Sequence, residues 1–426
     1  MKHVMNQLCI GALIGVLVCA CGTPRKERMQ EKTETLTAAE ILGNPDYLAI
    51  SYGGYRMASR SQQPTIEQLI EDMRILHAMG IRVLRTYNVQ LPHAAHVLEA
   101  IDAIQKTDKD FEMYVMLGAW IDCKNAWTDQ PVDHSQESEA NAAEIERAIA
   151  LAKKYPHIVK VLAVGNEAMV KWAERYYVQA EIVLNWVQYI QEQKRQGKLP
   201  KTLWVTSSDN FASWGGGDPE YHVPALAQLM HAVDFISMHT YPMHDTHYNP
   251  AFWGVDKEDL AKDKKEALEK VMDRAVVYAQ QQYQQVKNYM ESVGAQKPIH
   301  IGETGWASAS NGFYGLKGSK ATDEYKQALY YKKVRAWTQK QKISCFYFEA
   351  FDEPWKDAVN PGGSENHFGL FTVNGQAKYA LWSKVDSAVF NGLGRGGKPI
   401  GKTFNGQEKM VLDASEIPYA SQGIKP

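Results

Sequence analysis

The sequence predicts an α/β protein with one large (β/α)8 barrel of the TIM type. Eight short apolar segments recur along the chain, and segments with a helical pattern separate them. The apolar segments are apolar on both faces, as parallel strands covered by helices are. An open, doubly wound sheet usually has a glycine-rich phosphate loop after its first strand. The first segment here ends in Ser51-Tyr52-Gly53-Gly54-Tyr55, which lacks that pattern, so the barrel is favoured.

The expected strands and helices alternate from residue 47 to residue 389. We expect strands at 47–52, 81–87, 111–117, 159–164, 202–207, 233–241, 298–303 and 343–349. We expect helices at 65–79, 93–106, 137–154, 173–196, 222–231, 257–292, 321–340 and 377–389. In the first helix, Thr65 is a suitable N-cap and Gly80 a suitable stop. Between them one helical face is apolar at Ile66, Leu69, Ile70, Met73 and Leu76.

The first 44 residues are expected to lie outside the barrel. The apolar run 8–20 has the length of a signal-peptide core and is too short to predict a transmembrane helix. It ends in Val18-Cys19-Ala20-Cys21, which is similar to a bacterial lipobox. We therefore expect a signal peptide at 1–20, a lipid on Cys21 and a flexible tether at 21–44. This predicts a lipid-anchored envelope protein, at the outer membrane or surface of a Gram-negative bacterium; an ordinary secretory signal is the alternative.

Composition narrows the class of partner. The 47 Lys and Arg nearly balance the 49 Asp and Glu, for a net charge of −2, so no basic surface for nucleic acid is indicated. The barrel, 45–390, contains Cys123 and Cys345, which we expect to be free thiols. We expect no cofactor, no metal ion and a monomer. Residues 391–426, rich in Gly, Lys and Ser, are expected to form a loose tail packed back on the barrel.

Two glutamates stand at the carboxyl ends of opposed strands, where barrel active sites lie. Glu167 follows the fourth expected strand and Glu303 ends the seventh. Paired carboxylates across a gap are what glycosidic cleavage needs, one protonated and one ionised. Arg85 and Tyr241 would lower the pKa of Glu303, which makes it the nucleophile. Glu167 is then the acid, although a glutamate at a strand end can also cap a helix or pair with arginine.

Asn166 is placed to bond the sugar 2-hydroxyl. Arg85 as a structural ion pair and Tyr241 as a core residue are the alternative interpretations. His239 and His244 also lie at the end of an expected strand. Each of them could contact the sugar or support the glutamates, and the sequence pattern fits both roles equally.

Several short motifs in this order resemble glycoside hydrolase family 17, the family of plant, fungal and bacterial β-1,3-glucanases. They are Val164-Gly165-Asn166-Glu167, Gly302-Glu303-Thr304-Gly305-Trp306 and the stretch from Phe348 to Lys356. Ile81 to Asn88 and Tyr241-Pro242 fit as well. The resemblance implies a retaining clan-A glycosidase, with Glu167 as acid and base and Glu303 as nucleophile. Family 5 cellulases usually have Asn-Glu-Pro where this chain has Asn166-Glu167-Ala168.

Further residues at the strand ends are candidates for sugar contacts. Trp306 is expected to form the floor of a sugar site. The looser aromatic candidates are Tyr52, Trp120, Trp355 and Phe371. Tyr87 and Asn88 follow the second strand. The charged residues at the eighth strand fit two roles equally well, as sugar contacts or as a supporting ion-pair network. They are Glu349, Glu353 and Lys356.

The leading hypothesis is therefore an endo-acting β-1,3-glucanase that binds a neutral, laminarin-like glucan. The linkage follows from the family resemblance alone. A β-1,3-glucan transglycosylase, in which a sugar replaces water as acceptor, is the second hypothesis. A surface glycan-binding lipoprotein on an inactive barrel is the third, and the presence of both Glu167 and Glu303 argues against it.

Overall fold

The computed structural model describes residues 36–260 and 262–418. The expected signal peptide, the lipidation site Cys21 and most of the expected tether lie outside these residues. Of the described residues, those from Thr37 onward form one compact unit, and everything below concerns that unit.

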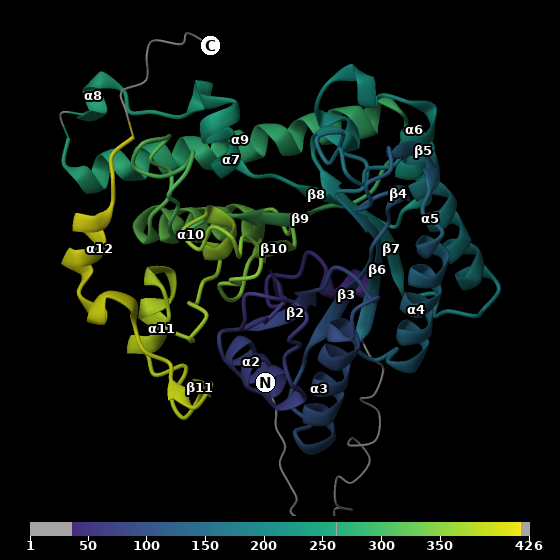
Figure 1. Cartoon of the computed structure of the whole chain (residues 1–426), viewed down its shortest axis with the longest axis horizontal. Coiled ribbons are helices and arrows are strands. Elements are labelled where there is room, and N and C mark those ends of the chain that lie inside the picture. Colours follow the sequence, from purple (N-terminus) through teal and green to yellow (C-terminus); the bar gives the residue numbers. More distant parts are fainter. Residues whose placement is uncertain (1–35, 261, 419–426) are drawn as a thin grey trace, which may run out of the picture. The chain divides into compact units, whose positions relative to one another are not determined.

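Eight parallel strands close into a barrel, in the order β1-β10-β9-β8-β7-β6-β3-β2 (Figure 1). All eight strands predicted from the sequence are confirmed, with ends shifted by a few residues. They are β1 (Leu48–Ser51), β2 (Ile81–Arg85), β3 (Tyr114–Ala119), β6 (Val159–Asn166), β7 (Trp204–Asn210), β8 (Ile236–His239), β9 (Ile299–Gly305) and β10 (Cys345–Phe348). A hairpin not foreseen from the sequence follows β3 and consists of β4 (Cys123–Lys124) and β5 (Asp133–Glu137).

Helices follow the strands and cover the barrel; for example, α4 packs on β3 and β6, and α5 on β6 and β7. The principal helices are α2 (Ile66–Ala78), α3 (His93–Thr107), α4 (Ala140–Lys154), α5 (Ala180–Arg195), α6 (Pro224–Ala232), α9 (Lys264–Ser292) and α10 (Glu324–Lys340). Shorter ones are α1 (Ala38–Ile41), α7 (Pro242–Tyr248), α8 (Lys257–Leu260), α11 (Trp382–Asp386) and α12 (Glu408–Ala414). Thr65 caps α2 through a capping box, as predicted. None of the helices described is both long and apolar enough to cross a membrane.

Both ends of this unit are more ordered than the sequence indicated. Ala38 and Ile41 of α1 are buried, and the N–H of Gly43 donates to the Ser344 hydroxyl at 2.9 Å. The expected tether therefore passes into the barrel unit several residues before position 44. Burial of two apolar side chains outweighs the polar character of the surrounding sequence.

The segment after residue 391 was expected to be loose, and this is wrong up to residue 418. It contains a small hairpin of β11 (Gly394–Arg395) and β12 (Lys398–Pro399). Arg395 is buried and pairs with Asp72 of α2 at 2.8 Å. Val411 is also buried. A buried ion pair and apolar contacts thus fix this segment on the barrel, which agrees with the expectation that it packs back but not with the expectation that it is loose.

Candidate active site

Glu167 and Glu303 lie close together at the carboxyl ends of the strands. Glu167 follows β6 directly, and Glu303 lies within β9. Nδ1 of His239 is 3.1 Å from Oε1 of Glu167 and 3.7 Å from Oε2 of Glu303. These two carboxylate oxygens are therefore at most about 7 Å apart, compatible with the roughly 5 Å separation of retaining glycosidases.

The backbone around each glutamate has a special form. Gly165 and Glu167 both have positive φ, 81° and 48°, so the chain turns sharply as it leaves β6. The N–H of Glu167 donates to the Ser208 carbonyl of β7 at 2.9 Å, which fixes that turn. Next to Glu303, a Cβ on Gly302 would overlap the hydroxyls of Ser208 and Ser237. Glycine at this position therefore leaves room for polar groups beneath the glutamates.

Arg85 and Tyr241 bind Glu303, as the sequence predicted. Arg85 at the end of β2 is 1% exposed and forms an ion pair with Glu303. Its guanidinium also donates to Oδ1 of Asn166 at 2.6 Å. The Tyr241 hydroxyl donates to the other oxygen of Glu303 at 2.7 Å. Two donors thus hold Glu303, and Arg85 links it to the residue before Glu167.

These surroundings drive the pKa values of the two glutamates apart. Burial and the charge of Glu303 raise the pKa of Glu167 from 4.5 to about 8. Burial would also raise the pKa of Glu303, but His239, Arg85 and Tyr241 more than offset it and lower the pKa to about 2. At neutral pH one carboxyl is protonated and the other ionised. This is the division that an acid and a nucleophile require.

His239 belongs to a buried hydrogen-bonded chain beneath the glutamates. Its Nε2 lies 2.7 Å from the Ser208 hydroxyl, which lies 2.8 Å from the Ser237 hydroxyl. Burial lowers the pKa of His239 to about 4, so the ring is neutral at pH 7. The His239 ring carries a positive charge only in acid, so it lowers the pKa of Glu303 only in the acid range in which Glu303 itself titrates. Near neutrality Arg85 and Tyr241 keep Glu303 ionised. Since His239 is 0% exposed, it supports Glu167 rather than contacting sugar.

Two aromatic residues expected to contact sugar are buried in packing, and these expectations are wrong. Trp306 is 0% exposed; its indole N–H donates to the Ala321 carbonyl at 2.8 Å, and its ring packs against Tyr330. Tyr52 is 0% exposed, and its hydroxyl donates to Asp72 at 3.0 Å. Neither ring has a free face, because each side chain is directed into the surrounding structure.

The charged residues of the eighth strand form an ion-pair network. Lys356 lies 2.7 Å from Glu349 and 3.5 Å from Glu353. Glu353 also accepts the N–H of Tyr55 at 3.0 Å. Glu349 and Glu353 are buried, so the interpretation of these two as sugar contacts is corrected in favour of the network. The side chain of Lys356 stays partly exposed, which keeps it a candidate contact.

Tyr87 and Asn88 follow β2 and are partly exposed. The Arg85 guanidinium lies 4.6 Å from the centre of the Tyr87 ring. Oδ1 of Asn88 accepts the N–H of Leu91 at 3.3 Å and closes the turn before α3. His244 contacts the Tyr314 hydroxyl through Nδ1 at 2.9 Å. Tyr87 and Asn88 stay candidates for substrate binding.

Asp209 is a residue whose role the sequence did not reveal. It is buried, and it accepts the N–H of Met169 at 2.7 Å and the Ser213 hydroxyl at 2.6 Å. Burial raises its pKa to about 6. Asp209 thus ties down the loop that begins with Glu167. It lies near the end of β7, and its partner Met169, 40 positions away, is visible only in the fold.

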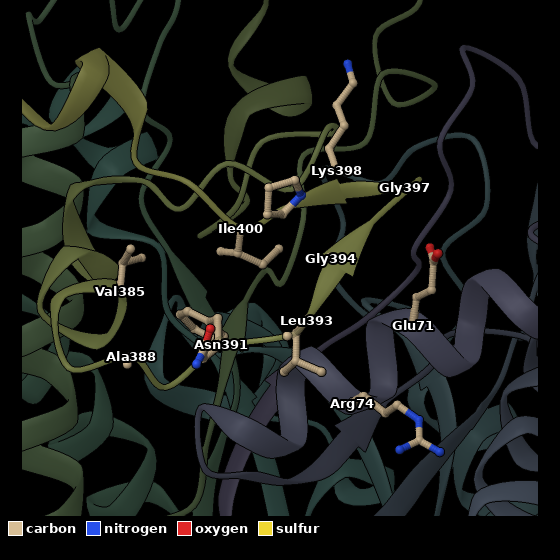
Figure 2. A pocket seen from close by; sticks show the side chains of 13 residues that line it. Glu71, Arg74, Val385, Ala388, Asn391, Leu393, Gly394, Gly397, Lys398 and Ile400 are labelled. Atoms are coloured by element: carbon tan, nitrogen blue, oxygen red, sulfur yellow. The ribbon is translucent and has the colours of Figure 1, made fainter.

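A separate hollow of about 690 Å³ lies between α2 and the segment that carries β11 and β12. Figure 2 shows Glu71 and Arg74 on its helical side and Leu393 and Ile400 on the other. Neither catalytic candidate lines it, so it is not part of the glutamate site.

Comparison with known proteins gives concordant results. Residues 49–369 match the BtgE/BtgC glycoside hydrolase domain family. An endo-laminarinase from Formosa Hel1_33_131 has a similar crystal structure: 61% identity, a TM-score of 0.91, and coverage of 92% of this chain and all of that one. A β-1,3-glucanosyltransferase from Rhizomucor miehei, solved with laminaritriose, is 20% identical and has a TM-score of 0.52. The match covers 79% of this chain and 96% of that one, and it shows that the two share the fold.

An Aspergillus niger protein named as a putative glucan endo-1,3-beta-glucosidase, btgC, is 27% identical over 310 residues. The match covers 71% of this chain but only 37% of that protein. The chain therefore spans little more than a third of the length of this relative.

Proposed function

Because the chain belongs to the BtgE/BtgC glycoside hydrolase domain family, we propose that it is a retaining glycosidase that cleaves β-1,3-glucan. The family gives the class of reaction. The Formosa relative is named as an endo-laminarinase, and this supports a laminarin-like substrate and cleavage within the chain.

Glu303 is the nucleophile in this proposal. Its ionised carboxylate attacks the anomeric carbon, and the bond from that carbon to the leaving oxygen breaks. Glu167 gives its proton to that oxygen, so the shortened chain leaves as an alcohol and a glycosyl ester forms on Glu303. Glu167, now ionised, removes a proton from water, the water oxygen attacks the same carbon, and Glu303 is released. Two inversions leave the anomeric configuration unchanged.

One observation carries the proposal: the two carboxyls lie within about 7 Å of each other around His239 and have opposite surroundings. Arg85 and Tyr241 donate to Glu303 and stabilise its charge. Glu167 faces a neutral ring and the negative charge of Glu303, which favour its protonated form. Arg85 also fixes the amide of Asn166, whose place beside Glu167 suits a bond to the sugar 2-hydroxyl.

The test is hydrolysis of laminarin, a β-1,4-glucan and a mixed-linkage glucan by the parent chain and by Glu303→Ala and Glu167→Ala. We expect cleavage of laminarin to mixed oligomers by the parent, and a loss of at least about 10³-fold in kcat for Glu303→Ala. Proton NMR of the first products should show the β anomer. Equal rates for parent and Glu303→Ala would reject the assignment, and products longer than the substrate would favour transglycosylation.

We also propose that the protein is lipid-anchored through Cys21 in the cell envelope, since the lipobox-like sequence precedes it. Metabolic labelling with a palmitate analogue should mark the parent and not Cys21→Ala. Equal labelling of both would reject this anchor.

A further inference from the structure

Three aromatic side chains form a contiguous cluster on the loops next to Glu167, with Trp127 stacked on Tyr176 and Trp120 tilted by 44° against it. Trp127, between β4 and β5, is 55% exposed. Its ring lies 5.3 Å from that of Tyr176 at an interplanar angle of 21°. Tyr176 in turn lies 5.1 Å from Trp120, which follows β3 directly. We call Trp120, Tyr176 and Trp127 the aromatic platform.

The platform is held in a defined position. Oδ1 of Asp122 accepts the indole N–H of Trp120 at 2.6 Å and that of Trp127 at 3.0 Å. Trp127 also has a positive φ of 60°, which is unfavourable for a bulky side chain. The Trp127 ring is therefore held in place on a strained backbone while more than half of its surface stays exposed. Such an arrangement is typical of a ligand-binding surface.

The platform lies on the Glu167 side of the site. Tyr176 belongs to the loop that follows Glu167, and burial together with the charge of Glu167 raises the pKa of Tyr176. Trp120 follows β3, the neighbour of β6 in the barrel, whereas Glu303 lies on β9 across it. The acid protonates the leaving oxygen, so the chain segment that leaves extends past Glu167 and away from Glu303.

A groove of about 590 Å³ continues outward from Trp127. Its wall carries positively charged, negatively charged and neutral side chains that can form hydrogen bonds. Such a mixture suits the hydroxyls of an uncharged sugar. These include Gln130, His134, Lys171, Glu174 and Arg175.

We propose that the aromatic platform, with Trp127 at its outer end, binds the glucosyl units on the leaving-group side of the cleaved bond. The C–H faces of these sugars pack on the indole ring, and their hydroxyls face the groove. This rests on the proposed glucanase function and deepens it, because it assigns a binding role to a loop outside the glutamate pair. It also predicts that affinity depends on the length of the leaving segment.

The test compares two substrates that share the glycosyl side and differ in the leaving group. Laminarihexaose places sugars on both sides of the cleaved bond, whereas 4-nitrophenyl β-laminaribioside leaves no sugar on the platform. For Trp127→Ala we expect kcat/KM on the hexaose to fall about tenfold, mainly through KM, while the rate on the aryl substrate stays within about twofold. Trp127→Phe keeps a ring and should recover most of the loss.

Tyr189→Ala is the matched control, because Tyr189 is an exposed aromatic residue, 37% exposed, on the outer helix α5. It should leave both rates unchanged. Equal losses on both substrates in Trp127→Ala, or no loss on either, would overturn the platform proposal. The parent rates on the two substrates report the glucanase function independently of either result.

Discussion

The raised pKa of Glu167 predicts that replacing this residue makes the protein more stable at neutral and basic pH. An unfolded chain releases the Glu167 proton near pH 4.5, whereas the folded chain keeps it up to about pH 8. Between these values the folded state binds one proton more than the unfolded state, so stability falls as pH rises. Glu167→Gln keeps the size and hydrogen bonding of the protonated acid and removes this effect.

The magnitude follows from the same two values. They are about 3.5 units apart, and each unit corresponds to about 1.36 kcal/mol. Most of this interval lies between pH 5 and pH 8. We therefore expect the free energy of unfolding of Glu167→Gln to exceed that of the parent by an amount that grows by roughly 3 to 4 kcal/mol over that range.

Urea unfolding followed by tryptophan fluorescence at pH 5, 6, 7 and 8 measures this difference. The comparison of variant with parent at each pH cancels the titration of the groups that the charge of Glu167 does not reach. Asp209, whose pKa is raised mainly by burial and in part by Glu167, does not cancel completely. Glu139→Gln, an exposed glutamate before α4, makes the same chemical change at the surface and should show no widening gap. A gap between Glu167→Gln and parent that stays constant within about 0.5 kcal/mol from pH 5 to pH 8 would refute the reasoning.

Other consequences follow from the same site. The pH profile of kcat/KM should fall about tenfold per unit above pH 8, where Glu167 loses its proton, and should stay level on the acid side down to about pH 4, where His239 becomes charged beside Glu167. In Arg85→Gln the pKa of Glu303 should rise, so the acid limb should move to higher pH and kcat should fall; an unchanged profile speaks against the ion pair. Gly302→Ala should lose about 1–3 kcal/mol in thermal unfolding because its Cβ overlaps the hydroxyls of Ser208 and Ser237, and a neutral result would contradict that contact.

The sequence predicted the barrel and the glutamate pair because both depend on local sequence patterns. Apolar runs define the strands, and a residue such as Glu167 directly after a run must lie at the carboxyl end of the barrel. The partners of Glu303 could be predicted in the same way, since Arg85 and Tyr241 also end or follow strands. Strand position is thus enough to bring residues to one end of a barrel.

Side-chain direction could not be predicted from strand position. Trp306 follows the β9 strand directly, but its indole points into packing against Tyr330 and not into the cleft. Trp127 lies in a hairpin loop that no apolar pattern marks, and its position depends on the Asp122 carboxylate. Likewise, Arg395 reaches Asp72 across 323 positions of sequence. These contacts follow from the closed fold and have no local signal.

The covalent intermediate tests the central claim most directly. A 2-deoxy-2-fluoro-β-laminaribiosyl fluoride carries a leaving group that departs readily, while its 2-fluorine slows hydrolysis of the ester that forms. Peptide mass spectrometry after incubation should place one laminaribiosyl derivative on Glu303, with none on Glu167, and Glu303→Ala should remain unlabelled. A label on Glu167, or an unlabelled enzyme that releases the α anomer from laminarin, would contradict a retaining mechanism through Glu303.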